Sequence, residues 1–359
     1  MSIPMESLFL YLPIFLALYQ NRKGPVVLLQ FGSRKVLLVS SPSAAEECFT
    51  KNDIIFANRP RLLIGKQLGY NYTSLAWAPY GDHWRNLRRI ATLEILSAAR
   101  LQTMFNELTM NVMMTDDRWT KTLVEFLLTL QETDPEYYKD EIIKGLMMVL
   151  LIAGTDTTTN TMEWTFSLLL NHPEILKKAQ TEIDNRVGHG RLLDETDLVH
   201  LPFLRNIINE SLRMYPVAPL LVPHESSDDC KVGGFHVPRG TMLMVNMWAI
   251  QNDPKIWVDP RKFKPERFEG VEAARDGFRS MPFGSGRRGC PGEGLALRMI
   301  GLTLGSLIQC FEWERPSKEI IDMREGIGFT MPKAQPLIAK CHPRPTMLKL
   351  LSQTLNQVK

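Results

Sequence analysis

The stretch FGSGRRGCPGEG, residues 283–294, contains five glycines, two arginines and one cysteine, and it runs into an apolar segment typical of a helix. Such a loop could cradle a phosphate, present a nucleophile or hold a metal. Gly284, Gly286 and Gly289 match the GxGxxG pattern of dinucleotide-binding loops. That pattern should follow a buried strand, whereas residues 275–283 include charges and a proline, with no βαβ alternation around them. The sequence therefore disfavours a phosphate site.

Cys290 offers a second interpretation of the same loop. It is expected at the start of a helix with Arg287 and Arg288 close by, and a helix N-terminus and nearby cations both favour a thiolate. Gly289 and Gly292 would let backbone N–H groups point at the sulfur and leave room for a flat, bulky group. The hypothesis is a nucleophile or metal ligand. The alternative is a small buried cysteine in a tight turn, because free cysteine is among the most buried residue types.

The bulk composition describes an ordinary globular protein. The 359 residues are 23% charged and 44% hydrophobic, which excludes a disordered chain. A net charge of +3 without long basic runs gives no reason to expect nucleic-acid binding. The five cysteines are widely spaced and include no CxxC pair, so neither a disulfide framework nor a zinc cluster is indicated. A reducing, cytosol-facing environment is the simplest context.

The N-terminus carries the apolar run LFLYLPIFLALY, residues 8–19, followed by Arg22 and Lys23. The run is shorter than the roughly 20 residues that span a bilayer. We expect residues 1–20 to form a marginal hydrophobic anchor. One alternative is a cleaved signal peptide, although the basic n-region of such a peptide is missing here. The other alternative is a buried helix.

The rest of the chain predicts a mainly helical protein with small sheets. Residues 24–41 indicate a β-hairpin that turns at Gly32 and Ser33. A helix is then expected with Ser43 as its cap and Glu46 three residues on. A second strand pair is expected around Gly233 and Gly234.

The longest expected helix covers residues 140–171 and has an unusual centre. The stretch AGTDTTTNT, residues 153–161, places polar side chains where a buried helix would prefer leucine or alanine. Threonine hydroxyls in such a position can bond to preceding carbonyls and bend a helix. The alternative is that two helices meet here at a loop.

A carboxylate on an apolar helical stripe marks the segment PFLRNIINESLRMYP, residues 202–216. Glu210 lies between Ile207 and Met214 on that stripe, so burial would require a cation, which Arg213 can supply. Arg267, in FKPERF, is a possible third partner. The alternative is a solvent-exposed pair that contributes little.

Taken in order, four motifs make this sequence similar to plant cytochrome P-450 enzymes of the microsomal type, which are haem-thiolate monooxygenases. They are AGTDTT (153–158), ESLR (210–213), PERF (265–268) and FGSGRRGCPG (283–292). The last matches FxxGxRxCxG. Residues 69–89, 140–157 and 331–337 further resemble isoflavone hydroxylases and related enzymes of specialised metabolism. The resemblance implies a mainly α fold with small β-sheets, of the cytochrome P-450 type, as one haem-thiolate domain over residues 24–359.

The resemblance also implies roles on the proximal side of a haem b cofactor. Cys290 would be the iron ligand, and its thiolate would favour O–O cleavage. Phe283 would pack against the porphyrin near the sulfur. The residues expected to bind the haem propionates are Trp84, Arg88, His224 and Arg288, with His224 at a position where many relatives have arginine.

On the distal side, the resemblance implies that Asp156 and Thr157 deliver protons to bound oxygen, beside a kink where Gly154 leaves space for O2. Glu210, Arg213 and Arg267 would form a buried structural network. The substrate would be small, aromatic and mostly apolar. Its expected walls are residues 61–80, 147–153 and 217–221 and the turn near Phe329.

The implied partners are O2, the substrate and a membrane-bound NADPH-cytochrome reductase that supplies electrons. The reductase would dock near the cysteine on Arg85, Arg89, Lys262 and Arg287. The family relationship implies the cytosolic face of the endoplasmic reticulum membrane, reached through the N-terminus.

The chain is also shorter than members of this family, and most helices that cover the distal pocket are missing between residues 117 and 118. Without that cover, apolar walls and the haem edge would face water. Two hypotheses follow: a working monooxygenase, and a truncated haem-thiolate protein without catalysis, the product of a degenerate or mis-spliced gene. A haem-thiolate isomerase or dehydratase is disfavoured, because such enzymes do not need the relay of Asp156 and Thr157.

Overall fold

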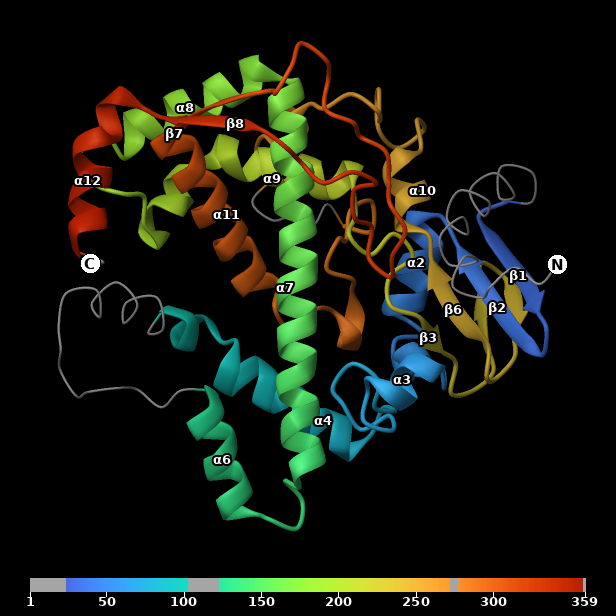
Figure 1. Cartoon of the computed structure of the whole chain (residues 1–359). Coiled ribbons are helices and arrows are strands. Elements are labelled where there is room, and N and C mark those ends of the chain that lie inside the picture. Colours follow the sequence, from blue (N-terminus) through green and yellow to red (C-terminus); the bar gives the residue numbers. More distant parts are fainter. Residues whose placement is uncertain (1–23, 103–122, 272–276, 358–359) are drawn as a thin grey trace.

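The computed structural model describes residues 24–102, 123–271 and 277–357. The expected anchor, residues 1–20, and the expected loss of helices between residues 117 and 118 lie outside these ranges. The described chain is mainly helical with small sheets, as predicted, and α7 runs through the length of the molecule (Figure 1). The α-helices are α2 (Pro42–Phe49), α3 (Leu63–Gln67), α4 (Asp82–Arg89), α6 (Leu123–Thr133), α7 (Asp140–Asn171), α8 (Pro173–Arg186), α9 (Pro202–Met214), α10 (Met247–Asn252), α11 (Glu293–Cys310) and α12 (Leu348–Gln357).

Short helical turns and strands complete the description. The turns are η1 (Ile55–Ala57), the π-helical η2 (Ile90–Ile95), η3 (Glu195–His200), η4 (Pro265–Phe268), η5 (Gly286–Arg288) and η6 (Pro345–Met347). The strands are β1 (Val26–Phe31), β2 (Arg34–Val39), β3 (His224–Glu225), β4 (Cys230–Val232), β5 (Phe235–Val237), β6 (Met242–Val245), β7 (Phe311–Glu314) and β8 (Lys340–Pro343).

The largest sheet has the order β1-β2-β6-β3 and lies to one side of α7 (Figure 1). Strands β1 and β2 form the predicted hairpin, with Phe31 paired to Arg34 across the turn. Strand β2 then runs parallel to β6, and β3 adds antiparallel to the other edge of β6. Val36–Val39 and Met242–Val245 are buried throughout, as expected of central strands covered on both faces.

Helix α2 begins two residues earlier than the sequence predicts, so the prediction of Ser43 as its cap is wrong. Ser41 is the N-cap, and its hydroxyl accepts the N–H of Ala44 at 3.3 Å. Pro42 explains the difference, because its fixed φ suits the first helical position and pushes the cap back to the preceding residue. The second strand pair forms as predicted, and both Gly233 and Gly234 have positive φ, as a tight β4–β5 turn requires.

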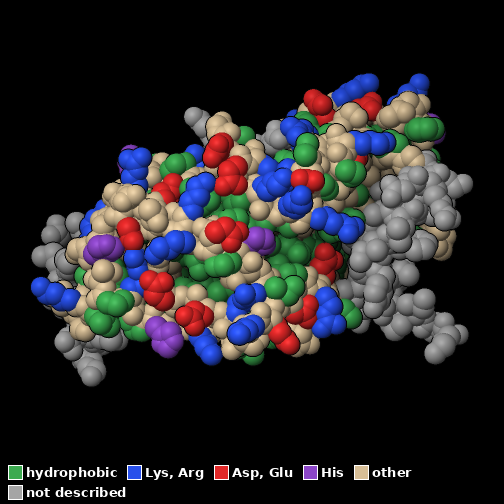
Figure 2. Space-filling model, turned by 90° about the horizontal axis from the view of Figure 1, so that it is seen from above, with side chains coloured by type: hydrophobic (Ala, Val, Ile, Leu, Met, Phe, Trp, Pro, Cys, Tyr) green, Lys and Arg blue, Asp and Glu red, His purple; other side chains and the backbone are tan. Residues whose placement is uncertain are grey.

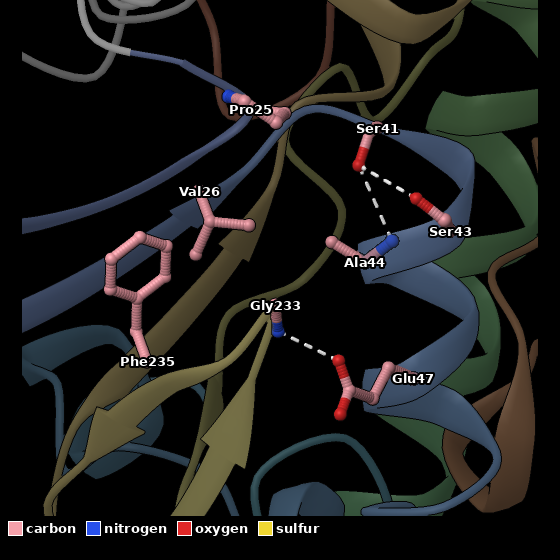
Figure 3. Close-up of a pocket in the computed structure, with 8 residues that line it drawn as sticks. All are labelled: Pro25, Val26, Ser41, Ser43, Ala44, Glu47, Gly233 and Phe235. Carbon is pink, nitrogen blue, oxygen red and sulfur yellow. Dashed lines mark hydrogen bonds between the residues drawn. The ribbon is translucent and has the colours of Figure 1, made fainter.

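A small surface pocket of about 370 Å³ lies between the hairpin, α2 and the β4–β5 turn (Figure 3). Its one charged group is Glu47, whose carboxylate accepts the backbone N–H of Gly233 at 2.7 Å. The pocket therefore marks where α2 is tied to the strand pair.

Helix α7 is continuous over 32 residues, so the interpretation of two helices joined by a loop is wrong. Its threonines accommodate the polar centre by donating to carbonyls one turn back, from Thr157 to Ala153, from Thr161 to Thr157 and from Thr165 to Thr161. The C-terminal half of α7 packs against α8, α9 and α11 around a core that includes Leu169, Ile207 and Leu304. The N-terminal half contacts α6 (Figure 1).

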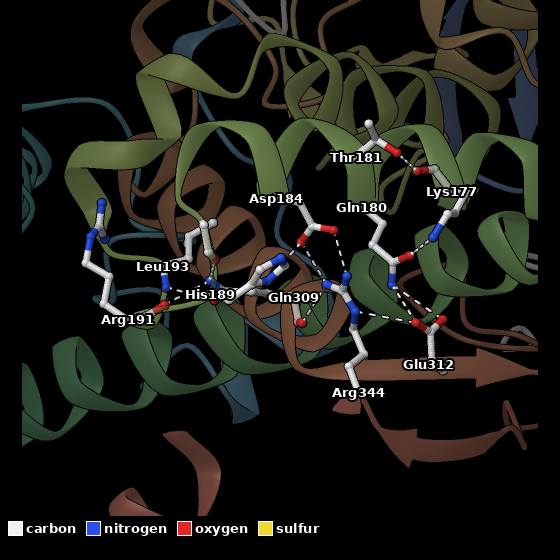
Figure 4. A network of polar contacts seen from close by, with 11 residues as sticks. Lys177, Gln180, Thr181, Asp184, His189, Arg191, Leu193, Gln309, Glu312 and Arg344 are labelled. Carbon is white, nitrogen blue, oxygen red and sulfur yellow. Dashed lines mark hydrogen bonds and ion pairs between the residues drawn. The ribbon is translucent and has the colours of Figure 1, made fainter. Parts of the chain in front are cut away.

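The C-terminal strand pair is held to this helical core by a buried guanidinium (Figure 4). Arg344 forms a bidentate pair with Asp184 of α8, at 2.9 and 2.6 Å, and donates to the carbonyl of Gln309 in α11. The Gln309 side chain in turn accepts the N–H of Leu193. The network thus joins α8, α11 and the segment before η3.

The surface seen from above mixes opposite charges, and basic and acidic side chains alternate over short distances (Figure 2). This face therefore presents no broad field of one sign.

Candidate functional site

The loop that carries Cys290 is closed by its own backbone. The N–H of Cys290 donates to the carbonyl of Phe283 at 2.8 Å, and that of Gly284 donates to Met281 at 2.9 Å. Cys290 is exposed, and α11 begins three residues later with Gly292 as its N-cap. A Cβ atom at Gly292 would lie 3.8 Å from the Cys290 sulfur, so glycine keeps this side of the thiol clear.

The same loop is anchored to the turn that follows α2 through Asp53. The Asp53 carboxylate accepts the backbone N–H of Arg287 at 2.9 Å and pairs with its guanidinium at 3.0 Å. Gly286 has a φ of +67°, and a side chain there would collide with the Asp53 carboxylate. Glycine is therefore required at this position on two separate grounds.

Three guanidinium groups gather around this loop and bond to carbonyls. Arg88, from α4, donates to the carbonyl of Gly289 at 2.6 Å. Arg288 donates to the carbonyls of Ala57 and Ala78 at 2.7 and 2.6 Å. Arg59 donates to the carbonyls of residues 222 and 223 at 2.8 Å each.

Trp84 completes this cluster from α4. Its ring lies under the Arg288 guanidinium at 4.3 Å, and its Nε1–H donates to the carbonyl of Leu75. The structure thus brings together Trp84, Arg88 and Arg288, which the sequence singled out, and adds Arg59.

Among the described residues, no carboxylate neutralises the charges of this cluster. In the described ranges, none of the three arginines forms an ion pair with a carboxylate. Burial, followed by repulsion from Arg59 and Arg88, lowers the pKa of Arg288 to about 8, and burial lowers the pKa of Arg59 to about 9. All three arginines are half-buried, and cations removed from water without a carboxylate partner are costly, so the cluster is suited to receive an anion.

His224, on β3, borders the same cluster. It is buried and its Nδ1–H donates to the carbonyl of Phe56 at 2.7 Å. Burial, together with Arg59, holds the pKa of His224 well below its usual range. The imidazole is therefore neutral at pH 7.

These residues fit a flat cofactor with carboxylate arms. Such arms would neutralise Arg88 and Arg288, and the exposed thiol would face the cofactor plane. Across residues 24–102, 123–271 and 277–357, no three His, Cys, Asp or Glu side chains converge as a metal site. A metal at Cys290 would therefore need its other ligands from the cofactor itself, as haem provides.

The comparisons with known proteins agree with this geometry. The family model described as cytochrome P-450 matches residues 13–118 and 103–339. The chain belongs to the cytochrome P-450 family. It is 46% identical to cytochrome P-450 81Q32 of Catharanthus roseus, over 93% of this chain and 88% of the relative. It is 42% identical to isoflavone 3'-hydroxylase of Medicago truncatula, over 90% of this chain and 86% of the relative.

A solved zebrafish cytochrome P-450, described with abiraterone, superposes with a TM-score of 0.79 at 25% identity, covering 92% of this chain and 99% of the other. The predicted cytochrome P-450 fold is confirmed. The alignment to the Catharanthus protein runs over 439 positions, more than the 359 residues of this chain, so that relative has internal segments that this chain lacks.

Asp156 and Thr157, the residues expected on the distal side, lie midway along α7. The Asp156 carboxylate accepts the hydroxyl of Thr330 at 2.7 Å and the amide of Asn160 at 3.4 Å. Thr157 donates to the carbonyl of Ala153. The helix is uninterrupted at Gly154, whose α-carbon faces open space, so no break in α7 accompanies this glycine.

The walls expected around the substrate differ in exposure. On α7, Met148 is 37%, Leu151 61% and Ile152 47% exposed, and Phe329 is 57% exposed. Val217 and Leu220 are buried instead. By length and composition, α7 is the one helix in the described ranges that could also cross a membrane, with 17% of its apolar window buried. A long apolar face of α7 is therefore open.

Glu210, Arg213 and Arg267 form a buried network between α9 and η4. Arg213 pairs with both carboxylate oxygens of Glu210, at 2.7 and 2.9 Å, and Arg267 adds a contact at 3.1 Å. Glu210 and Arg213 are fully buried, and Arg213 also donates to the carbonyls of Gln251 and Pro260. The carboxylate thus has the cations that its burial requires.

The four basic residues expected to dock a reductase are exposed, and each has an acidic neighbour. The pairs are Arg85 with Asp82, Arg89 with Glu94, Lys262 with Asp259 and Arg287 with Asp53. Their charges are therefore partly neutralised locally.

Sequence reasoning missed Arg59 and Thr330. Arg59 precedes Pro60 in the stretch ANRPR, a weak turn signal, and two of its carbonyl partners, at residues 222 and 223, lie more than 160 residues away. Thr330 carries no signal in the sequence. The contacts that give both residues their roles form only in the folded chain.

Proposed function

We propose that this protein is an NADPH- and O2-dependent monooxygenase with a haem b cofactor, acting on a small apolar or aromatic plant metabolite of flavonoid or isoflavonoid type. One oxygen atom enters a C–H bond of the substrate, and the other leaves as water. The balance requires two electrons from NADPH, delivered by an NADPH-cytochrome reductase, and two protons. Residues 24–359 form one domain, held by residues 1–20 at the cytosolic face of the endoplasmic reticulum membrane.

The unneutralised cationic cluster beside Cys290 is the observation that supports this proposal most strongly. Trp84, Arg88 and Arg288 would hold the carboxylates of haem, with neutral His224 at the edge of the cluster. Cys290 would bind the iron, and Phe283 would pack near the sulfur. Haem supplies the iron at which O2 is reduced and cleaved.

The polar centre of α7 supports the proton-transfer part of the proposal. Asp156 is exposed, so its carboxylate is in contact with water. Thr157 follows it directly, and its hydroxyl is oriented by the carbonyl of Ala153. Asp156 would take protons from solvent, and Thr157 would hold the acceptor oxygen in place.

The substrate class rests on the names of relatives and on the open apolar face of α7. Relatives include an isoflavone 3'-hydroxylase and an isoflavone 2'-hydroxylase, both of Medicago truncatula. Leu151, Ile152 and Phe329 provide exposed apolar surface of the kind that an aromatic ring contacts.

Reconstitution with reductase, NADPH and ¹⁸O2 tests this function. The purified chain is incubated with isoflavones and flavonoids, and products are analysed by mass spectrometry. One ¹⁸O atom per hydroxylated product is expected. Product with oxygen from water, or no product from a haem-loaded protein, would contradict the proposal.

The exposure of Leu151 and Ile152 favours a second candidate, a haem-thiolate protein without catalysis. These side chains leave the distal side open to water. Water at that side would divert electrons from the oxidation of the substrate. This candidate predicts the spectrum of thiolate-ligated haem and no oxidised product in the reconstituted reaction. The ¹⁸O2 experiment therefore separates the two.

A further inference from the structure

One face of α7 carries three side chains that all reach the same distant loop. Asp156, Asn160 and Trp164 are spaced four residues apart, so they lie on one helical stripe. The first two contact Thr330, and the Nε1–H of Trp164 donates to the carbonyl of Met331 at 2.8 Å. The loop is thus seated along two turns of the helix.

The hydrogen-bond directions at Thr330 follow from the groups involved. A carboxylate only accepts, so the Thr330 hydroxyl donates to Asp156 at 2.7 Å. The Asn160 amide then donates to the Thr330 oxygen at 3.2 Å, and more weakly to Asp156 at 3.4 Å. The Thr330 hydroxyl therefore donates one hydrogen bond, to Asp156, and accepts one, from Asn160.

The anchor on the far side of the loop is rigid. Asn160 is buried, and Trp164 is fully buried and stacks on Tyr215 at 4.0 Å with an angle of 7°. The N–H of Met331 donates to the carbonyl of Val217 at 2.9 Å. Thr330 is therefore held between two fixed elements, whereas the Asp156 side chain is exposed and would otherwise sample several rotamers.

We propose that Thr330 is a positioning residue that fixes the Asp156 carboxylate for proton delivery, with Asn160 orienting the Thr330 hydroxyl. The inference rests on the proposed function. Phe329, the neighbour of Thr330, is exposed among the expected substrate walls. The loop that would contact the substrate therefore also sets the orientation of the proton-transfer acid.

The first test does not depend on haem. A double-mutant cycle combines Thr330→Val with Asp156→Ala in the full chain, and the unfolding equilibrium is measured in urea. Thr330→Val should change the unfolding constant about tenfold in the native background and far less beside Asp156→Ala, as expected for a hydrogen bond to a charged group. Equal effects in both backgrounds would overturn the proposal.

The second test uses the haem-loaded protein with reductase and substrate. Thr330→Val should lower kcat about tenfold and raise the solvent isotope effect, with unchanged substrate affinity in a spectral titration. Thr330→Ser, which keeps the hydroxyl, should restore both kinetic values. A Thr330→Ser protein that behaves like Thr330→Val would overturn the positioning role.

The two tests fail in distinguishable ways. A protein that takes up no haem contradicts the proposed function and removes any catalytic role for Thr330, while the cycle still decides whether the pair is coupled. A haem-loaded protein with normal turnover in Thr330→Val contradicts the positioning role alone.

Discussion

The guanidinium groups near Cys290 are held in the folded protein at an electrostatic cost. Arg88 bonds to a single carbonyl, and burial lowers its pKa, so the folded protein disfavours its charged form. An anion at this site would reverse that preference. A residue that destabilises the haem-free protein and stabilises the haem-bound protein is expected at a cofactor-binding site.

Arg88→Met should therefore separate haem binding from folding. Haem affinity should fall by about 10- to 100-fold, the effect of losing a hydrogen bond to a charged group, whereas the stability of the haem-free chain should be unchanged or higher. Haem titration and urea unfolding measure the two quantities. Arg239→Met, at an exposed position, is the control. An equal loss of affinity in both variants would refute this role for Arg88.

His224 predicts a pH dependence of stability. Its pKa is well below 6.5 in the folded state and near 6.5 in the unfolded chain, so acid protonates the unfolded chain first. The stability associated with neutral His224 is complete above about pH 6.5 and is lost as the pH falls toward the folded pKa, by at most about 1.4 kcal/mol per pH unit.

His224→Gln tests this dependence because glutamine keeps an N–H donor for the Phe56 carbonyl. Urea unfolding of the haem-free chain between pH 7.5 and 5 should show a shallower loss of stability in the variant. Parallel curves for the two proteins would show that His224 does not titrate in this way.

At the scale of elements, the cysteine loop depends on two glycines that differ in their surroundings. Gly284 and Gly286 both have positive φ, of +70° and +67°. A side chain at Gly284 meets its nearest atom only at 4.0 Å, whereas one at Gly286 collides with the Asp53 carboxylate. A side chain at either position would therefore be strained by the left-handed backbone, but only one at Gly286 would also clash with a neighbour.

Gly284→Ala should cost about 1 to 2 kcal/mol from the left-handed backbone alone. Gly286→Ala should cost clearly more and should also lower haem affinity, because the bond from Arg287 to Asp53 must move. Unfolding and haem titration of both variants make the comparison. Equal losses in the two proteins would mean that the contact with Asp53 does not shape the loop.

The sequence predicts those elements that depend on local pattern. The hairpin, the β4–β5 pair and the whole of α7 follow from alternation, paired glycines and helical periodicity, and the Glu210 stripe indicates its buried cations. The cap of α2 was misplaced because Ser41 and Ser43 flank Pro42 and both are good caps. Arg59 and Thr330 could not be found, because the contacts that place Arg59 against residues 222 and 223, and Thr330 against α7, join residues more than 160 positions apart.

At the scale of the whole molecule, the apolar face of α7 is the most unusual part of the described surface. Leu151 is 61% exposed at the middle of the longest helix, where a soluble protein seldom shows apolar side chains together. The cytochrome P-450 fold is retained around this face, since the chain superposes on a solved zebrafish cytochrome P-450 with a TM-score of 0.79.

The open face should bind apolar dyes. A chain carrying both Leu151→Gln and Ile152→Gln should bind 8-anilinonaphthalene-1-sulfonate several-fold more weakly, with stability changed by no more than about 0.5 kcal/mol, because exposed positions contribute little to folding. Dye fluorescence and urea unfolding check this. A large loss of stability would instead mean that these side chains are covered in solution.

The most direct measurement is the carbon-monoxide difference spectrum of the reduced protein, recorded for the native chain, Cys290→Ser and, as a control at another exposed cysteine, Cys341→Ser. The native chain and Cys341→Ser should show the Soret band of thiolate-ligated haem, and Cys290→Ser should lose it. Absence of the band from the native chain, or its survival in Cys290→Ser, would contradict a haem-thiolate site at Cys290.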